Sequence, residues 1–381
     1  MAQKTGTAAS ILAEIGGATF SGNVILTANV TDAAELATLN NKVTGTITLF
    51  NNSQLLTGST KNLIDALKGI KGFKGDLNAT TAVTVADLKA LKASTSEGDL
   101  TLSSAALNST FVNVKAADII SAFKDVKKSG GPVTSIITIK ETITLAQAEE
   151  LSALTSGVVT ATIAPATATE LLAATFVNKV AADDSITVTV KGAYTSTDLI
   201  ALKAEYWVKT ISLSNKAQAL TVDVGTANAV DDLIAALANT GYKGNVTVTD
   251  TTGTAEITTA QLIALNNLTT GKITLNDASL AYDYSGTAAQ LVEAFAGITG
   301  LKGDIIVATG VPSIADLKAL NKSIDGTIKV TADTDLEGSA KDLIEALKDV
   351  TLTATSEVKV TGAVTLAQIL ELQKSVDANA D

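Results

Sequence analysis

The sequence repeats itself, and this internal repeat limits the possible folds more than any single motif does. Strand–helix units of two types alternate along its 381 residues. A type 1 unit carries the helical core pattern Leu-[Ile/Val]-x-Ala-[Leu/Phe], as in residues 63–67, and a type 2 unit carries the shorter core Leu-x-x-Leu, as at Leu88 and Leu91. Each pattern occurs seven times, so the chain is predicted to be one array of stacked units.

The two types recur at similar distances along the whole chain. The type 1 cores begin at Ile11, Leu63, Ile119, Leu171, Leu233, Leu291 and Leu343. The type 2 cores begin at Leu36, Leu88, Leu151, Leu199, Leu262, Leu317 and Ile369. A double unit has about 52 residues and a single unit about 26, which lies within the range of leucine-rich-repeat-like units.

After nearly every helical core comes a glycine and a short alternating run with the character of a strand, as in residues 45–49 and 271–275. We expect this glycine to be the positive-φ residue that ends the helix, and the β-branched run to start the strand. Each helix is predicted to open on a capping Ser or Thr. The predicted caps are Thr31, Thr84, Ser196, Thr258, Ser313 and Thr365.

Alternating strands and helices require parallel strands with right-handed crossovers. The predicted fold is therefore α/β: a single repeat solenoid over residues 1–381, of about fourteen strand–helix units in seven double repeats of about 52 residues, with one parallel sheet. The architecture is leucine-rich-repeat-like, although the leucine-rich consensus with its Asn ladder is not present. The alternative is two or three separate α/β domains.

Composition excludes several classes of function. The chain contains no His and no Cys, which removes the commonest acid–base residue, the commonest zinc ligand, thiol nucleophiles and disulfides. Its net charge of −11 would repel nucleic acid. No 18 apolar residues follow one another, and the N-terminus lacks the pattern of a signal peptide, so we predict a soluble chain without membrane insertion.

Two sets of residues are candidates for binding. Thr-x-Thr segments lie at residues 46–48, 187–189 and 247–249, and a regular array of them could match ice or a glycan, although Thr is also common on half-exposed strand faces. Acidic residues could offer oxygen ligands to calcium, but without a calcium-loop motif they fit solvated helix N-termini better. These residues are Asp183, Asp184, Asp231, Asp232, Asp333, Asp335 and Glu337.

Other features have structural explanations. The glycines at 69, 72, 300 and 303 follow a helix and precede a strand, the reverse of a phosphate-binding loop, so we interpret them as helix stops. Tyr206 and Trp207 are predicted to fill a gap in the core. Because the loops are short and similar to one another, we predict no enzyme activity, no catalytic residue, no cofactor and no metal site.

The segments Thr84–Leu91 and Thr258–Thr274 carry a resemblance to known repeats. They read Thr-Val-Ala-Asp-Leu-Lys-Ala-Leu and Thr-Thr-Ala-Gln-Leu-Ile-Ala-Leu-Asn-Asn-Leu-Thr-Thr-Gly-Lys-Ile-Thr. In these units the chain resembles the Ala/Thr-rich repeats of surface and secreted proteins of marine cyanobacteria and of structural proteins of the phages that infect them. The resemblance implies a role in presentation or adhesion and transfers no functional residue.

The sequence predicts a non-catalytic structural protein on an exterior surface, either in a cell-surface layer or appendage or as a virion fibre or decoration protein. Ile11 and Ile15 begin a unit and Ile369 and Leu372 end one, so we expect apolar end faces that assemble head to tail or laterally. The alternative is a binding module whose Thr-rich sheet face holds a glycan, ice or a protein. Its location would be extracellular, on a cell surface or on a virion.

Overall fold

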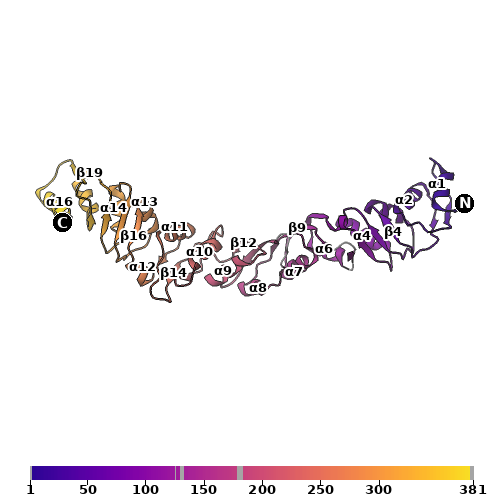
Figure 1. Ribbon diagram of the computed structural model, residues 1–381, viewed down its shortest axis with the longest axis horizontal. Helices are drawn as coiled ribbons and strands as arrows, with labels where there is room; N and C mark the ends of the chain where they lie inside the picture. The colour runs from indigo at the N-terminus through magenta and orange to yellow at the C-terminus, as the bar shows by residue number, and fades with distance from the viewer. Residues whose placement is uncertain (1, 125, 129–132, 178–182, 378–381) are drawn as a thin grey trace. The chain divides into compact units, whose positions relative to one another are not determined.

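The computed structural model describes residues 2–124, 126–128, 133–177 and 183–377. The described residues divide into two compact parts: those within 1–166, 173–188 and 206–210 belong to the first, and those within 167–172, 189–205 and 211–381 to the second. Within each part, strand–helix units that are consecutive in the sequence are neighbours in space (Figure 1). The predicted alternation of strands and helices is thereby confirmed.

The helices follow the two core patterns. Those of type 1 units are α1 (Ala8–Ile15), α3 (Thr60–Leu67), α6 (Ala116–Phe123), α8 (Ala168–Leu172), α10 (Ala229–Leu237), α13 (Ala288–Ala294) and α15 (Ala340–Ala346). Those of type 2 units are α2 (Ala33–Lys42), α4 (Val85–Ser94), α7 (Leu145–Leu154), α9 (Ser196–Ala204), α11 (Thr259–Leu268), α14 (Ile314–Leu320) and α16 (Leu366–Asp377). Two short helices, α5 (Ser104–Leu107) and α12 (Asp277–Ala281), lie in loops.

The strands are short and precede the helices. They are β1 (Gln3–Gly6), β2 (Asn23–Leu26), β3 (Ile47–Thr48), β4 (Leu56–Gly58), β5 (Leu77–Ala79), β6 (Leu100–Leu102), β7 (Thr110–Val114), β8 (Lys127–Lys128), β9 (Ile136–Ile143), β10 (Val159–Ile163), β11 (Ser185–Val190), β12 (Val208–Leu213), β13 (Leu220–Asp223), β14 (Val246–Thr249), β15 (Ile273–Thr274), β16 (Tyr284–Thr287), β17 (Ile305–Thr309), β18 (Ile328–Val330), β19 (Leu336–Ser339), β20 (Val350–Thr351) and β21 (Val358–Thr361).

The strand pairs are parallel, as predicted, but the expectation of one continuous sheet is wrong. The described strands form small sheets of two to five strands, ordered β1-β2-β3, β4-β5-β6-β8, β7-β9-β10-β11-β12, β13-β14-β15, β16-β17-β18-β20 and β19-β21. The reason is that several units, most of them of type 1, contribute two strands that belong to different sheets. Thus β3 closes one sheet, a turn in which Asn51 accepts from the Ser53 amide follows, and β4 opens the next sheet.

The core lies between the helices and one face of each sheet. The first leucine of the type 2 core is fully buried in α2, α4, α7, α9, α11 and α14, as are Leu63 and Leu343 of type 1 helices. In β2 and β14, alternate residues are buried, so one strand face meets the helices. Burying each Leu or Val in this way contributes about 1.5–3 kcal/mol relative to exposure.

The glycines that open strands have a different role from the predicted one. Positive φ occurs at Gly69, Gly72 and Gly300, which are helix stops as expected, but not at the strand-opening glycines. These instead lie against the backbone of the preceding unit: a Cβ added at Gly98 would overlap the carbonyl oxygen of Gly75. The same stacking joins Gly45 to Gly22, Gly271 to Gly244, and Gly326 to Gly303.

Helix N-caps confirm the predicted chemistry with two shifts in position. Thr84, Thr258 and Ser313 cap α4, α11 and α14 with reciprocal capping boxes, and Thr365 exchanges the same bonds with Gln368. The prediction of Thr31 is wrong because Asp32 accepts from the Ala34 amide instead. The prediction of Ser196 is wrong because Thr195 forms the capping box with Asp198, and the Ser196 hydroxyl donates to the Thr221 carbonyl.

A substitution at the strand-opening position tests the close approach of units. We expect Gly98→Ala to lower the free energy of unfolding by about 1–3 kcal/mol, the usual cost of overpacking. The control is Gly17→Ala, where nothing lies within 4 Å of the added Cβ. Urea unfolding of both variants, followed by circular dichroism, measures the difference, and equal stability of the two would contradict the proposed role of Gly98.

Candidate functional site

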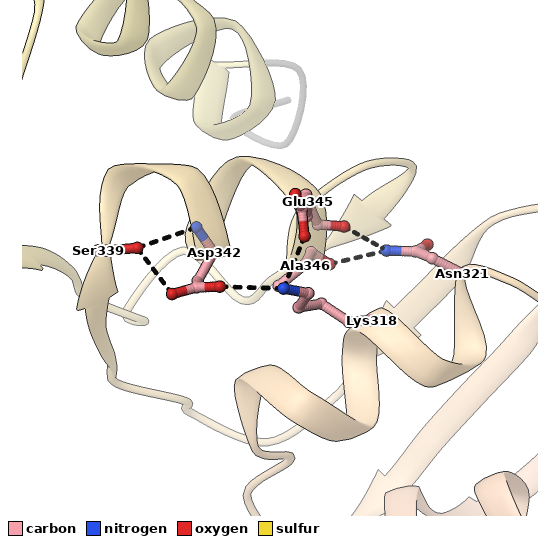
Figure 2. Close-up of polar contacts among 6 residues, drawn as sticks. All are labelled: Lys318, Asn321, Ser339, Asp342, Glu345 and Ala346. Atoms are coloured by element: carbon pink, nitrogen blue, oxygen red, sulfur yellow. Dashed lines mark hydrogen bonds and ion pairs between the residues drawn. The ribbon is translucent and has the colours of Figure 1, made fainter.

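A recurring set of polar contacts joins four type 2 helices, α2, α4, α11 and α14, to the type 1 helix that follows each of them. In the second part of the chain, Asn321 extends from the end of α14 toward the end of α15 (Figure 2). Its Nδ2 donates to the carbonyl oxygens of Glu345 at 3.2 Å and Ala346 at 2.9 Å. The last carbonyls of a helix lack partners within it, so Asn321 caps α15 from a neighbouring unit.

The same position serves this purpose in other units. Four residues after the first core leucine, Asn40 donates to the carbonyls of Asp65 and Lys68, and Asn266 donates to those of Glu293 and Ala294. At this position in α4, Lys92 Nζ donates to the carbonyls of Ser121 and Lys124 at 3.3 and 2.6 Å. An amide or ammonium donor at a helix C-terminus is favoured by both hydrogen bonding and the helix dipole.

Ion pairs add to these caps in two of the junctions. Lys318 Nζ lies 2.9 Å from Asp342 and 2.6 Å from Glu345 of α15 (Figure 2), and Lys89 Nζ lies 2.5 Å from Asp118 of α6. Both lysines directly follow the first core leucine. The hydrogen bonds that Lys318 donates to Glu345 and, to a smaller extent, to Asp342 raise the pKa of Lys318, but exposed pairs of this kind contribute little to stability.

A second set of contacts joins the beginnings of consecutive strands. Asp283 accepts from the Asp304 amide at 2.6 Å, and Asp304 in turn accepts from the Thr327 amide at 3.1 Å. Equivalent bonds run from Thr46 to Asn23, from Asp99 to Asp76, from Lys272 to Asn245 and from Glu357 to Asp335. We call this row of side chains the Asx ladder. Its sequence signal is an Asp or Asn at a strand start, which the helix-core and glycine patterns of the repeat do not include.

Asp304 is the most strongly perturbed carboxyl of the Asx ladder. Lys329 Nζ lies 2.6 Å from its Oδ2, and the Thr327 hydroxyl donates to its Oδ1 at 2.6 Å. These contacts, the Lys329 bond first, lower the pKa of Asp304 to about 2. The Asp304 carboxylate therefore accepts hydrogen bonds from three groups of the following unit: the amide and the hydroxyl of Thr327 and the ammonium of Lys329.

The Thr-x-Thr segments lie in register in some sheets and not in others. Thr221, Thr247 and Thr274 are direct neighbours across β13, β14 and β15. In the first part, Thr162 pairs with Thr187, whereas Thr48 pairs with Ile25. Rows of threonine hydroxyls therefore form within some of the small sheets and do not continue from one sheet to the next.

Most of the acidic candidates have partners inside the repeat. Asp184 is buried and accepts from Ser152 and from the Val159 amide at 2.5 and 2.8 Å. Asp231 and Asp232 lie in the first turn of α10, as the helix N-terminus interpretation predicted. Asp333 accepts from the Thr353 hydroxyl, and Glu337 pairs with Lys359. Within the described ranges, His, Cys, Asp and Glu form no group of three or more able to hold a metal ion.

Two further candidates belong to the framework. Trp207 is buried and stacks on Phe176 with ring centroids 4.1 Å apart, which confirms the predicted core role. A cavity of about 480 Å³ lies beside Thr249, Asp250 and Asn276. The carboxylate of Asp250 already accepts from the Thr252 hydroxyl and the Ala255 amide at 2.6 and 2.7 Å, which lowers its pKa and fixes its own loop.

Comparisons with models of protein families, with curated proteins and with solved structures find no match to this chain. In the part of the chain that the structure describes, no helix has both the length and the apolar character needed to cross a bilayer. Function is therefore inferred from the chain's own residues and contacts.

The cap supplied by Asn321 can be tested by substitution. Asn321→Leu keeps the size of the side chain but removes its donor, so we expect the free energy of unfolding to fall by about 1–2 kcal/mol. Asn321→Lys is the matched control, since a lysine occupies the same position at Lys92. Chemical denaturation compares the three proteins, and a lysine variant as unstable as the leucine variant would contradict the capping role.

Acid unfolding tests Asp304. Its folded-state pKa of about 2 lies below the usual unfolded value of about 3.9, so its contribution to stability is complete above about pH 4 and is lost as the pH falls through about 2. We expect Asp304→Asn to be less stable than wild type at pH 5 and to lose less stability on acidification to about pH 2. Urea midpoints at both pH values provide the measurement. Asp325→Asn, at an exposed position nearby, is the control for the loss of one negative charge, and an acid response of Asp304→Asn equal to that of this control would contradict the role of Asp304.

Proposed function

We propose that this chain is a non-catalytic structural protein, a single α/β solenoid exposed on the exterior surface of a cell or a virion, where it assembles with further copies of itself. The observation that supports this proposal is the use of its repeated polar residues. The Asx ladder and the caps at Asn40, Lys92, Asn266 and Asn321 bind one strand–helix unit to the next.

Such contacts suit a protein whose task is to hold a shape. In an enzyme, polar side chains converge on one site and are held there by a scaffold. Here the polar residues recur in several units and each joins one unit to the next, as expected where each repeat contacts only its neighbours. A surface protein built this way is lengthened or shortened by whole units, and the resemblance to surface repeats is in keeping with that role.

A deletion of one double unit tests the solenoid. Residues 244–302 make up one double unit: they begin at Gly244 and end just before Gly303, the equivalent strand-opening glycine of the next double unit. Their removal joins Lys243 to Gly303, so that Gly303 takes the place of Gly244. We expect the shortened protein to fold and its long dimension, measured by small-angle X-ray scattering, to fall by roughly 10 Å, two strand spacings. The control deletes residues 244–287 and breaks the phase of the units. A compact wild-type particle, or unfolding of the phase-preserving variant, would contradict the proposal.

A second candidate is a binding module that uses its Thr-rich sheet face. The in-register row Thr221, Thr247 and Thr274 favours it, because equally spaced hydroxyl and methyl groups suit a repeating ligand such as a glycan or ice. Retention on a polysaccharide column, or reshaping of ice crystals, that is lost in a triple Thr→Val variant would support this function.

A further inference from the structure

The last type 2 helix, α16, leaves exposed a position that is buried in every other type 2 helix. The first core leucine has 0% exposure in α2, α4, α7, α9, α11 and α14, whereas Ile369 is 45% exposed. Leu366 and Leu370 beside it are 72% and 54% exposed. We define the α16 face as Val364, Leu366, Ile369, Leu370 and Gln373. Its apolar residues form an exposed patch, and exposed apolar patches on proteins commonly mark interaction sites.

Within each part, a type 2 helix packs against the type 1 helix that follows it, as α2 does on α3, α9 on α10, and α14 on α15. The residue after the first core leucine belongs to this contact region and is half-buried at Ile200 and Ile263. Leu370 has the same position in α16. In the internal junctions, the face equivalent to the α16 face is therefore covered by a type 1 helix.

The polar half of the junction is also present on α16. Gln373 lies four residues after Ile369, as Asn321 lies four residues after Leu317, and its side chain is exposed. The acceptors of Asn321 are the carbonyls two and three residues after Leu343. In α1, the equivalent residues are Ala13 and Glu14, both exposed.

A backbone contact of the internal junction has its counterparts as well. The Thr57 amide donates to the Thr31 carbonyl at 2.9 Å. Thr57 lies six residues before the first residue of its type 1 core, and Thr31 lies five residues before the first residue of its type 2 core. Thr5 and Val364 have these same offsets from Ile11 and Ile369. Because Asn23 and Thr27 bond to the carbonyls of Ala2 and Gly6, the parallel register turns the Thr5 amide toward the open edge of β1.

We propose that the α16 face binds the β1–α1 unit of a second copy of this chain, in the geometry of an internal type 2 to type 1 junction. The proposal rests on the proposed structural function and specifies its self-association. The exposed residues Ala9, Ser10 and Ala13 of α1 are small and allow close approach of a helix. The contact joins two different surfaces, so it leaves one of each free and forms open-ended chains.

The prediction that both ends present apolar faces is corrected by the structure. Ile11 and Ile15 are 1% and 9% exposed, buried by their own neighbours, and Lys4 pairs with Glu14 at 2.6 Å. The two surfaces therefore differ: α16 supplies apolar side chains and a donor, and β1–α1 supplies small residues and acceptors.

Sedimentation velocity over a wide range of concentration tests this interface with the whole chain. Wild type should form species that grow in mass with concentration. Ile369→Lys with Leu370→Lys, and separately Thr5→Pro, should remain monomeric, while an equimolar mixture of the two variants should form a dimer because each retains one intact surface. The controls Phe50→Lys and Val311→Lys, at positions 63% and 65% exposed elsewhere, should behave as wild type.

Cross-linking gives a second readout, since the chain has no cysteine of its own. Under mild oxidation, Gln373→Cys mixed with Ala13→Cys should give a mixed disulfide dimer. Preferential dimers of Gln373→Cys with itself would instead show a tail-to-tail contact and overturn the proposal. So would a wild-type chain that stays monomeric at high concentration. Small-angle X-ray scattering by that monomer separates the two proposals. An elongated monomer would contradict the proposed interface but would still agree with the proposed structural function.

Discussion

The close approach of consecutive units at the start of their strands is the contact on which the remaining structure depends. A unit of about 26 residues cannot bury its own apolar face, so it must share a core with its neighbours. At the glycine stacks, such as Gly75 with Gly98, the two backbones come closer than any side chain permits. This spacing lets short parallel strands pair and brings the leucines of adjacent helices into one layer.

Close packing of units creates a second requirement, which the polar residues meet. A helix that ends against a neighbour loses water at its last carbonyls, and an unpaired buried carbonyl is costly. Asn40, Asn266 and Asn321 supply the missing donors from the preceding unit. The Asx ladder does the same for amides at the strand starts, so the polar groups of one unit complete the secondary structure of the next.

The sequence predicts the features that depend on local pattern. The two core patterns locate the helices, the glycine-led β-branched runs locate the strands, and Thr84, Thr258 and Ser313 mark helix starts, because periodicity and capping act over a few residues. Features that depend on a neighbouring unit were not predictable in this way. The division into small sheets at β3 and β4, the true role of Gly98 and the ladder at Asp304 all arise from contacts over 20 residues away. Ile11 and Ile369 illustrate the limit, since the same residue type is buried in one unit and exposed in another.

The alternation of two unit types gives each part of the array a direction. The type 2 helices α2, α4, α11 and α14 donate through the residue four positions after the first core leucine, and the type 1 helices that follow them accept through carbonyls at their ends. Placing two type 2 helices side by side would set donors against donors and, at Lys89 or Lys318, an ammonium against another cation or an apolar residue. Mispaired junctions are therefore disfavoured by unsatisfied groups as well as by poorer packing. A uniform repeat would lack this discrimination, because a shift by one unit would restore every contact. With two types, a shift by one unit mismatches the junctions that carry these caps, whereas a shift by a full double unit again places a type 2 helix before a type 1 helix.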